Sequence, residues 1–88
     1  MFLHIGGDYI LKKKNIIGIF DLDNSTVMKT TRDFLNAAEK AGDVVYTSYE
    51  LPKSFIVYRN DEKESGRVIY ISQISAQTLT KRIKNNAV

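Results

Sequence analysis

Three short segments of this chain are apolar at consecutive positions instead of alternate ones: residues 16–20, 55–58 and 68–71. Each segment is too short for a buried helix and rich in β-branched or aromatic side chains, which is typical of strands buried on both faces. The chain has 88 residues and no cysteine, so no disulfide can assist a small hydrophobic core. The sequence therefore predicts a sheet that something must cover on both faces.

Further strands are predicted around these three segments. Strand-like stretches also occupy residues 2–5, 9–12 and 44–46. Gly6-Gly7-Asp8 joins the first two as a tight hairpin turn, since glycine enters turn conformations at low steric cost. The polar stretch 60–66 ends in glycine and predicts the exposed tip of a second hairpin, formed by residues 54–59 and 67–71.

Two segments have the period of amphipathic helices. The first runs from about Asn24 to Ala41, with Asp23, Asn24 and Ser25 as candidate N-caps and Gly42 as its end. The second is short and follows Ser75, a candidate N-cap; its apolar stripe consists of Ala76, Leu79 and Ile83.

The predicted elements follow in the order β-β-β-α-β-β-β-α, which indicates one α+β domain spanning residues 1–88. Its sheet is expected to be small, mixed and mostly antiparallel. Two short helices cover only one face of such a sheet, so the sequence predicts that a second copy covers the other face and that the chain forms a homo-oligomer. Five tyrosines suit an interface because each combines an apolar ring with a polar tip; they stand at positions 9, 46, 49, 58 and 70.

Asp21 and Asp23 form the one pattern that points to catalysis. With the strand before them they resemble the strand-end DxD motif of haloacid-dehalogenase-type phosphatases, in which the first Asp is the nucleophile. Here the threonine at 26 stands one position later than in that family, and 88 residues cannot hold its doubly wound domain. Helix capping explains these side chains more simply. His4 is the only histidine and Gly6-Gly7 is not followed by a helix, so we predict no catalytic residue, no metal site and no cofactor.

The positions of the charged residues, more than the net charge, indicate an anionic partner. Lys and Arg total 13 against 10 Asp and Glu, a net charge of +3. Two basic runs stand at 12–14 and 81–84, while Asp61, Glu62 and Glu64 lie in the hairpin tip, expected to be distal. If the two runs share an edge, the surface there is far more positive than the net charge suggests. The cations at 81–84 have a second explanation, because they complement the dipole at a helix C-terminus.

The same composition bears on the compartment. No apolar stretch approaches the roughly 20 residues of a membrane helix, and the chain starts with a strand-like segment instead of a signal peptide. The absence of cysteine fits a reducing compartment. We therefore expect a cytoplasmic protein with no membrane partner.

Four stretches carry a resemblance when they are taken in order. They are Phe2-Leu3-His4-Ile5-Gly6, Asn15-Ile16-Ile17-Gly18-Ile19-Phe20-Asp21, Pro52-Lys53-Ser54-Phe55-Ile56-Val57, and Ile69-Tyr70-Ile71-Ser72 with Ser75-Ala76-Gln77-Thr78-Leu79-Thr80-Lys81-Arg82. In their order and spacing they resemble the RemA/RemB family, and RemB-type members more closely. The resemblance covers nearly all of the chain.

This resemblance implies a small bacterial protein that controls biofilm extracellular matrix genes. RemA-type members imply a DNA-binding transcription regulator that forms closed rings and carries DNA on a basic outer surface. The family pattern has an arginine pair where this chain has Leu51-Pro52-Lys53, so contacts with DNA phosphates are expected from lysines. The predicted DNA-binding residues are Lys12, Lys13, Lys14, Lys53 and, as a weaker addition, Arg32. The alternative is a structural or regulatory oligomer without direct DNA binding, acting through protein contacts, with a RemA-like paralogue as a candidate partner.

Overall fold

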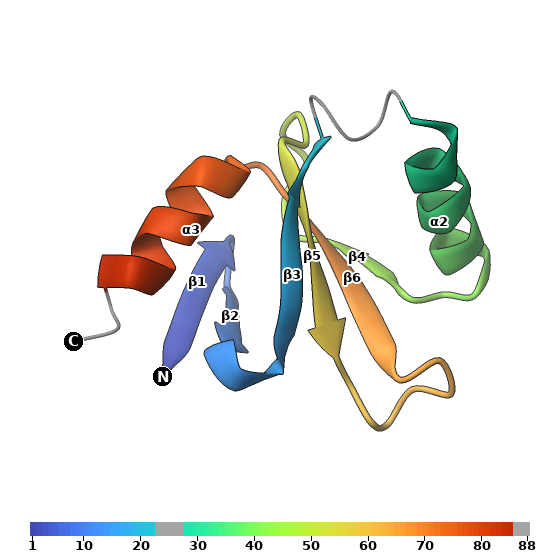
Figure 1. The fold of residues 1–88 in the computed structure, drawn as a ribbon, viewed down its shortest axis with the longest axis horizontal. Coiled ribbons are helices and arrows are strands. Elements are labelled where there is room, and N and C mark those ends of the chain that lie inside the picture. Colours follow the sequence, from blue (N-terminus) through green and yellow to red (C-terminus); the bar gives the residue numbers. More distant parts are fainter. Residues whose placement is uncertain (23–27, 86–88) are drawn as a thin grey trace.

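The computed structural model describes residues 1–22 and 28–85 (Figure 1). The described elements are β1 (Phe2–Gly6), β2 (Tyr9–Lys12), the 3₁₀ turn η1 (Lys13–Asn15), β3 (Ile16–Asp21), α2 (Lys29–Lys40), β4 (Val44–Tyr46), β5 (Ser54–Arg59), β6 (Arg67–Ser72) and α3 (Ala76–Asn85). The predicted order of strands and helices is confirmed for this part of the chain, and so is the α+β class.

The strands form two sheets instead of the single sheet that we expected. Strands β1 and β2 pair with each other as an antiparallel hairpin. The other four strands form a sheet in the order β3-β5-β6-β4, in which β3 and β6 both pair antiparallel with β5, and β4 pairs parallel with β6. The mixed, mostly antiparallel character is therefore confirmed.

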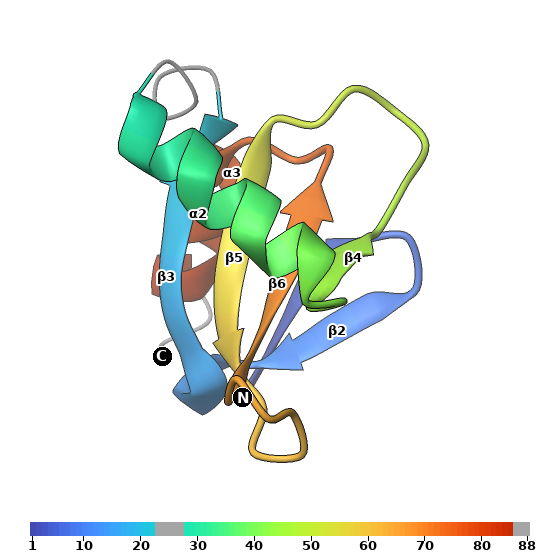
Figure 2. The ribbon, with the colours of Figure 1, turned by 90° about the vertical axis from the view of Figure 1, so that its right-hand side faces the viewer.

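Both faces of the four-stranded sheet are covered by the chain itself. One face packs Ile56 against Leu79 of α3 and against the inward side chains of the β1–β2 hairpin. The opposite face packs Phe55, Val57 and β6 against α2. Figure 2 shows this layering, with α2 in front of β5 and β6 and α3 behind them. The expectation that both helices share one face was wrong, because the hairpin and α3 cover one side and α2 the other.

This layering explains the consecutive apolar residues of β5. Phe55 and Val57 point toward α2, while Ile56 points toward α3 and the hairpin, and all three are buried. A fully buried isoleucine such as Ile56 stabilises the fold by about 1.5–3 kcal/mol. The doubly apolar strands thus serve two cores within one chain.

A pair of buried serines fastens the hairpin to the sheet. Ser72 Oγ donates to the carbonyl of Ile5 at 2.6 Å and accepts a hydrogen bond from the amide of Ile74 at 3.0 Å. Ser54, opposite Ser72 in the register, donates from Oγ to the carbonyl of Ile74 at 2.7 Å. Neither serine is exposed to solvent, so these bonds fix where β1 lies on the sheet.

The helix ends agree only in part with the sequence patterns. The α2 helix begins at Lys29, with Met28 as its N-cap, whereas the pattern predicted a start near Asn24. The candidate caps Asp23, Asn24 and Ser25 lie outside the described residues. At the other end, Gly42 has φ +76°, the left-handed conformation expected after a helix. Ser75 caps α3 as predicted, since its Oγ accepts a hydrogen bond from the amide of Thr78 at 3.2 Å.

Candidate nucleic-acid interface and tyrosine hollow

The two basic runs of the sequence meet in the structure. Lys12 ends β2, and Lys13 and Lys14 form the start of η1. Lys13 Nζ donates to the carbonyl of Ile83 in α3 at 3.1 Å, which brings residues 12–14 beside the last turns of that helix. In Figure 1, the C-terminal end of α3 lies on the left of the molecule, and η1 lies below it and nearer the centre. We call this surface the basic end; it consists of Lys12, Lys13, Lys14, Lys81, Arg82 and Lys84.

Two cations of the basic end also have structural partners. Lys13 is half-buried, and its ammonium satisfies a carbonyl near the C-terminus of α3, where a positive charge also complements the helix dipole. Arg82 Nη1 donates to the carbonyl of His4 at 3.1 Å and so holds α3 against β1. Lys12, Lys14, Lys81 and Lys84 are exposed.

Acidic side chains lie closer to Lys12 than we expected. Lys12 and Asn15 line a hollow of about 360 Å³ together with Asp61 and Glu62 of the β5–β6 tip. Asp61 also forms a two-point ion pair with Arg59, at 3.1 and 3.2 Å. The hydrogen bond and the charge of Asp61 raise the pKa of Arg59 above its usual value. The expectation of a distal acidic tip is wrong on the Lys12 side, and the potential there is weaker than beside α3.

The other two predicted DNA-binding residues lie away from the basic end. Ile16 pairs with Tyr58 and Asp21 with Ser54, so Lys53 sits at the far end of β3 from η1. Six strand residues span about 17 Å between their first and last Cα atoms. Arg32 is exposed on α2, on the opposite side of the sheet from α3. Thus the structure groups Lys12, Lys13 and Lys14 but places Lys53 and Arg32 elsewhere.

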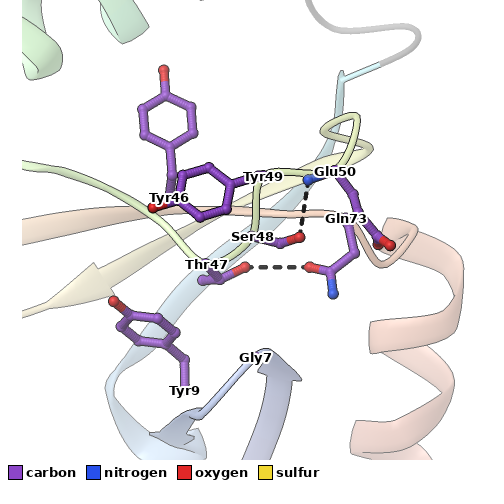
Figure 3. A pocket seen from close by; sticks show the side chains of 8 residues that line it. All are labelled: Gly7, Tyr9, Tyr46, Thr47, Ser48, Tyr49, Glu50 and Gln73. Atoms are coloured by element: carbon purple, nitrogen blue, oxygen red, sulfur yellow. Dashed lines mark hydrogen bonds between the residues drawn. The ribbon is translucent and has the colours of Figure 1, made fainter.

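A second surface is a broad hollow beside the β1–β2 turn, shown in Figure 3. It has a volume of about 680 Å³. The β1–β2 turn with the start of β2, the end of β4 with the segment after it, and the residue after β6 contribute its lining: Gly7, Tyr9, Tyr46, Thr47, Ser48, Tyr49, Glu50 and Gln73. We call this surface the tyrosine hollow.

Glycine allows the segments around the tyrosine hollow to approach each other closely. Gly7 has φ +56°, and a Cβ at this position would lie 2.6 Å from the backbone carbonyl oxygen of Thr47. A Cβ on Gly6 would lie 2.5 Å from Oε1 of Gln73. Thr47 Oγ1 donates to the carbonyl of Ile71 at 3.0 Å, which ties the β4–β5 loop to the sheet. The approach of Gly7 to the backbone of Thr47 is therefore one that only glycine permits.

The sequence analysis named the tyrosines but did not separate their roles. Tyr58 and Tyr70 are half-buried, and their ring centroids lie 5.8 Å apart in an edge-on contact. Tyr9 contacts Tyr70 at 5.8 Å and also reaches the hollow. Tyr46 and Tyr49 are exposed. The Gly6-Gly7 pair beside Tyr9 was the available signal, since a double glycine favours close backbone approach as well as a turn.

A third surface lies along β3, which forms one edge of the four-stranded sheet. A bulge after Ile16 turns Ile17 outward, where 66% of its surface is exposed. Beside the strand runs an apolar groove of about 270 Å³ lined by Thr30, Thr31, Phe34, Phe55, Val57 and Phe20. In Figure 2, α2 crosses the sheet diagonally from the end of β3 toward β4.

Metal-binding and membrane-spanning features are limited to what the described residues show. Within residues 1–22 and 28–85, no group of three or more histidine or acidic side chains is placed to hold a metal ion. Asp21 ends β3, whereas Asp23, the second acid of the DxD pattern, is outside this part of the chain. No helix in the described ranges is long and apolar enough to cross a membrane.

Comparison with known proteins agrees with the order of elements and motifs. The family model described as "Extracellular matrix regulatory protein A-like" (RemA-like) matches residues 2–83. The chain is also 30% identical over 82 residues to Extracellular matrix regulatory protein B of Bacillus subtilis (strain 168), and the alignment covers 93% of this chain and 89% of that protein. Both names describe a regulatory protein and not an enzyme. The chain belongs to the RemA-like family of extracellular matrix regulatory proteins.

Proposed function

We propose that this protein regulates extracellular matrix genes of a bacterial biofilm as a ring-like homo-oligomer that contacts the DNA backbone through lysines. The regulatory role follows the names of the family and of its Bacillus subtilis relative. DNA contact and assembly rest on two surfaces of this chain, the basic end and the β3 edge.

The convergence of two basic runs carries the DNA-binding part of the proposal. The hydrogen bond from Lys13 to Ile83 joins segments that are 70 residues apart in the sequence. The basic end therefore gathers six of the 13 Lys and Arg residues of the chain. No helix of a known base-reading motif presents these cations, so recognition of phosphates and DNA shape is expected. A ring of copies repeats the same patch and adds phosphate contacts.

The β3 edge supports self-association. An apolar edge strand without lysine or proline is a template for pairing with another chain, and natural proteins rarely leave one uncovered. Phe20 of this strand is 42% exposed beside the apolar groove, and its ring stacks on Phe55 at 5.0 Å. This edge replaces the uncovered sheet face as the reason to expect a homo-oligomer.

DNA binding is tested by polarisation titrations of a labelled duplex at several salt concentrations. The combined change Lys12→Gln, Lys14→Gln and Lys81→Gln should weaken binding and flatten the dependence of log K on log salt by about 0.9 per lost phosphate contact. Lys40→Gln is the matched control, because Lys40 is an exposed lysine at the end of α2, remote from the basic end. An affinity that is unchanged by the triple substitution would refute the assignment of phosphate contacts to the basic end.

Assembly is tested separately by measuring the mass in solution. Ile17→Lys places a charge on the β3 edge and should convert the oligomer into a smaller species. Asn36→Lys adds the same charge on an exposed position of α2 and should leave the mass unchanged. A mass insensitive to Ile17→Lys, or a wild-type monomer, contradicts assembly through β3.

The second candidate is a regulator that acts through protein contacts alone. Two observations favour it: acidic residues stand beside Lys12, and the β4–β5 loop exposes the large apolar side chains of Tyr49 and Leu51 with one cation, Lys53. Combined charge reversal, Lys12→Glu with Lys13→Glu and Lys14→Glu, discriminates between the two functions. DNA-dependent regulation should be lost, whereas regulation through the sheet or the loop should persist.

A further inference from the structure

The tyrosine hollow displays an unusual amount of unpartnered aromatic surface. Tyr46 is 54% exposed, Tyr49 is fully exposed, and Leu51 beside them is 79% exposed. Three large apolar side chains within six residues, at the end of β4 and in the loop after it, form a patch of the kind that marks binding sites. Tyrosine is well suited to such a site, because its ring offers a large contact area at little cost in conformational entropy.

The charge of the hollow favours a cation over an anion. Among the eight residues of its lining, Glu50 is the only ionisable side chain besides the tyrosines, and no lysine or arginine takes part. Aromatic ring faces carry partial negative charge and attract ammonium and guanidinium groups. A phosphate would meet these faces and a carboxylate with no compensating cation in the lining. The chemistry of the hollow is therefore opposite to that of the basic end.

The hydroxyl groups of Thr47 and Ser48 already form hydrogen bonds within the protein. Thr47 Oγ1 donates to the carbonyl of Ile71, and Ser48 Oγ accepts a hydrogen bond from the amide of Glu50 at 3.0 Å. Figure 3 shows this second bond between the Ser48 hydroxyl and the backbone nitrogen of Glu50, beside Tyr49. The bond orders the backbone that carries Tyr49 and Glu50. Tyr46, Tyr49 and Glu50 are exposed to solvent, and Figure 3 shows the Tyr49 ring and the Glu50 carboxylate extending to opposite sides of the loop.

We propose that the tyrosine hollow binds an arginine or lysine side chain within an extended segment of a partner protein. The cation contacts the tyrosine faces, the charge of Glu50 on the same loop attracts it, and apolar neighbours in the segment contact Tyr49 and Leu51. Gly7 packs closely against Thr47 and so orders the hollow in the unbound protein. This reduces the conformational entropy that is lost on binding. This site goes beyond DNA binding and does not depend on it.

The test is an NMR titration of the isotope-labelled protein with an acetylated, amidated Gly-Arg-Gly-Arg-Gly peptide. Saturable shifts are expected at Tyr46, Tyr49 and the side-chain amide of Gln73. Tyr49→Ala should weaken binding about 2–5-fold, the usual effect of one exposed cation–aromatic contact, whereas Tyr49→Phe keeps the ring and should preserve affinity. Both substitutions are at a fully exposed position, so neither removes a core contact.

Glu50→Gln provides a second, independent test of the proposed site. It should weaken the peptide about 2–5-fold at low salt and less at high salt, while Glu64→Gln, an exposed acid in the β5–β6 tip, should have no effect. The proposal is overturned if a Gly-Gln-Gly-Gln-Gly peptide shifts the same resonances equally, or if a short DNA duplex saturates them in preference to the peptide. It is also overturned if another copy of the chain occupies the wild-type hollow, seen without peptide as shifts of the same resonances that depend on protein concentration.

Discussion

The turn residue Gly7 gives the sharpest test of how this fold shapes the tyrosine hollow. Gly7→Ala meets two separate costs. The residue has φ +56°, and a left-handed alanine costs about 1–2 kcal/mol. The added Cβ would also lie 2.6 Å from the carbonyl oxygen of Thr47, a backbone atom that cannot rotate away. Separating the turn from the loop should cost about another 1–3 kcal/mol, by analogy with overpacked sites. We therefore expect a loss of about 2–5 kcal/mol in the free energy of unfolding.

Gly66→Ala is the matched control for this substitution. Gly66 has φ +78°, and a Cβ there would have no neighbour within 4 Å, so only the conformational cost of about 1–2 kcal/mol applies. Urea denaturation monitored by circular dichroism measures both variants, and an unchanged m-value ensures that the midpoints report stability. If the two variants lose equal stability, the close approach of the turn to Thr47 is not part of the folded protein and the reasoning fails. Gly7→Ala should also weaken the arginine peptide, which Gly66→Ala should not.

Three further predictions concern stability and its dependence on pH. Ser72→Ala should cost about 2–4 kcal/mol in chemical denaturation, because it leaves a buried carbonyl and a buried amide without their hydrogen-bond partner. Lys13→Met keeps the apolar stem but removes the ammonium from the C-terminal end of α3, and should cost about 0.3–1 kcal/mol, less in high salt. Burial, followed by the charges of two neighbouring tyrosines, raises the pKa of Tyr70. The unfolded chain then releases this proton first, so stability should fall as the pH rises above about 10, and Tyr70→Phe should make that fall shallower. A phenolate titration in which Tyr70 ionises no later than exposed tyrosines contradicts the last prediction.

The doubly apolar strands show how far local patterns predict this fold. Consecutive apolar residues at 55–58 correctly predicted a strand covered on both sides, because burial on two faces removes the alternation of polar residues. The source of the cover was not predictable in the same way. The β1–β2 hairpin lies on the sheet through the bond of Ser72 to Ile5, two residues 67 positions apart. The sequence around Ser72 does not indicate which distant carbonyl its hydroxyl will contact.

The candidate sites show the same division between local and distant information. The lysine run at 12–14 can be recognised in the sequence, but the residues that lie beside it in the folded protein cannot. Its meeting with α3 and with the β5–β6 tip depends on the packing of the first and last elements of the fold. Likewise, Tyr58 is half-buried where the amide of Lys12, 46 positions away on the β1–β2 hairpin, donates to its hydroxyl at 3.1 Å.

The two proposed binding surfaces lie at opposite ends of one short strand. Tyr9 begins β2 and lines the tyrosine hollow, whereas Lys12 ends it and belongs to the basic end, about 10 Å away along the strand. Their opposite charge chemistry makes them separable by salt, since binding to several phosphates weakens steeply with salt while a single cation seated on aromatic rings responds weakly. Glu50→Gln should therefore weaken the arginine peptide without reducing the affinity for DNA, and Lys14→Gln should do the reverse. If either substitution weakens the peptide and the DNA equally, the two ligands share one surface.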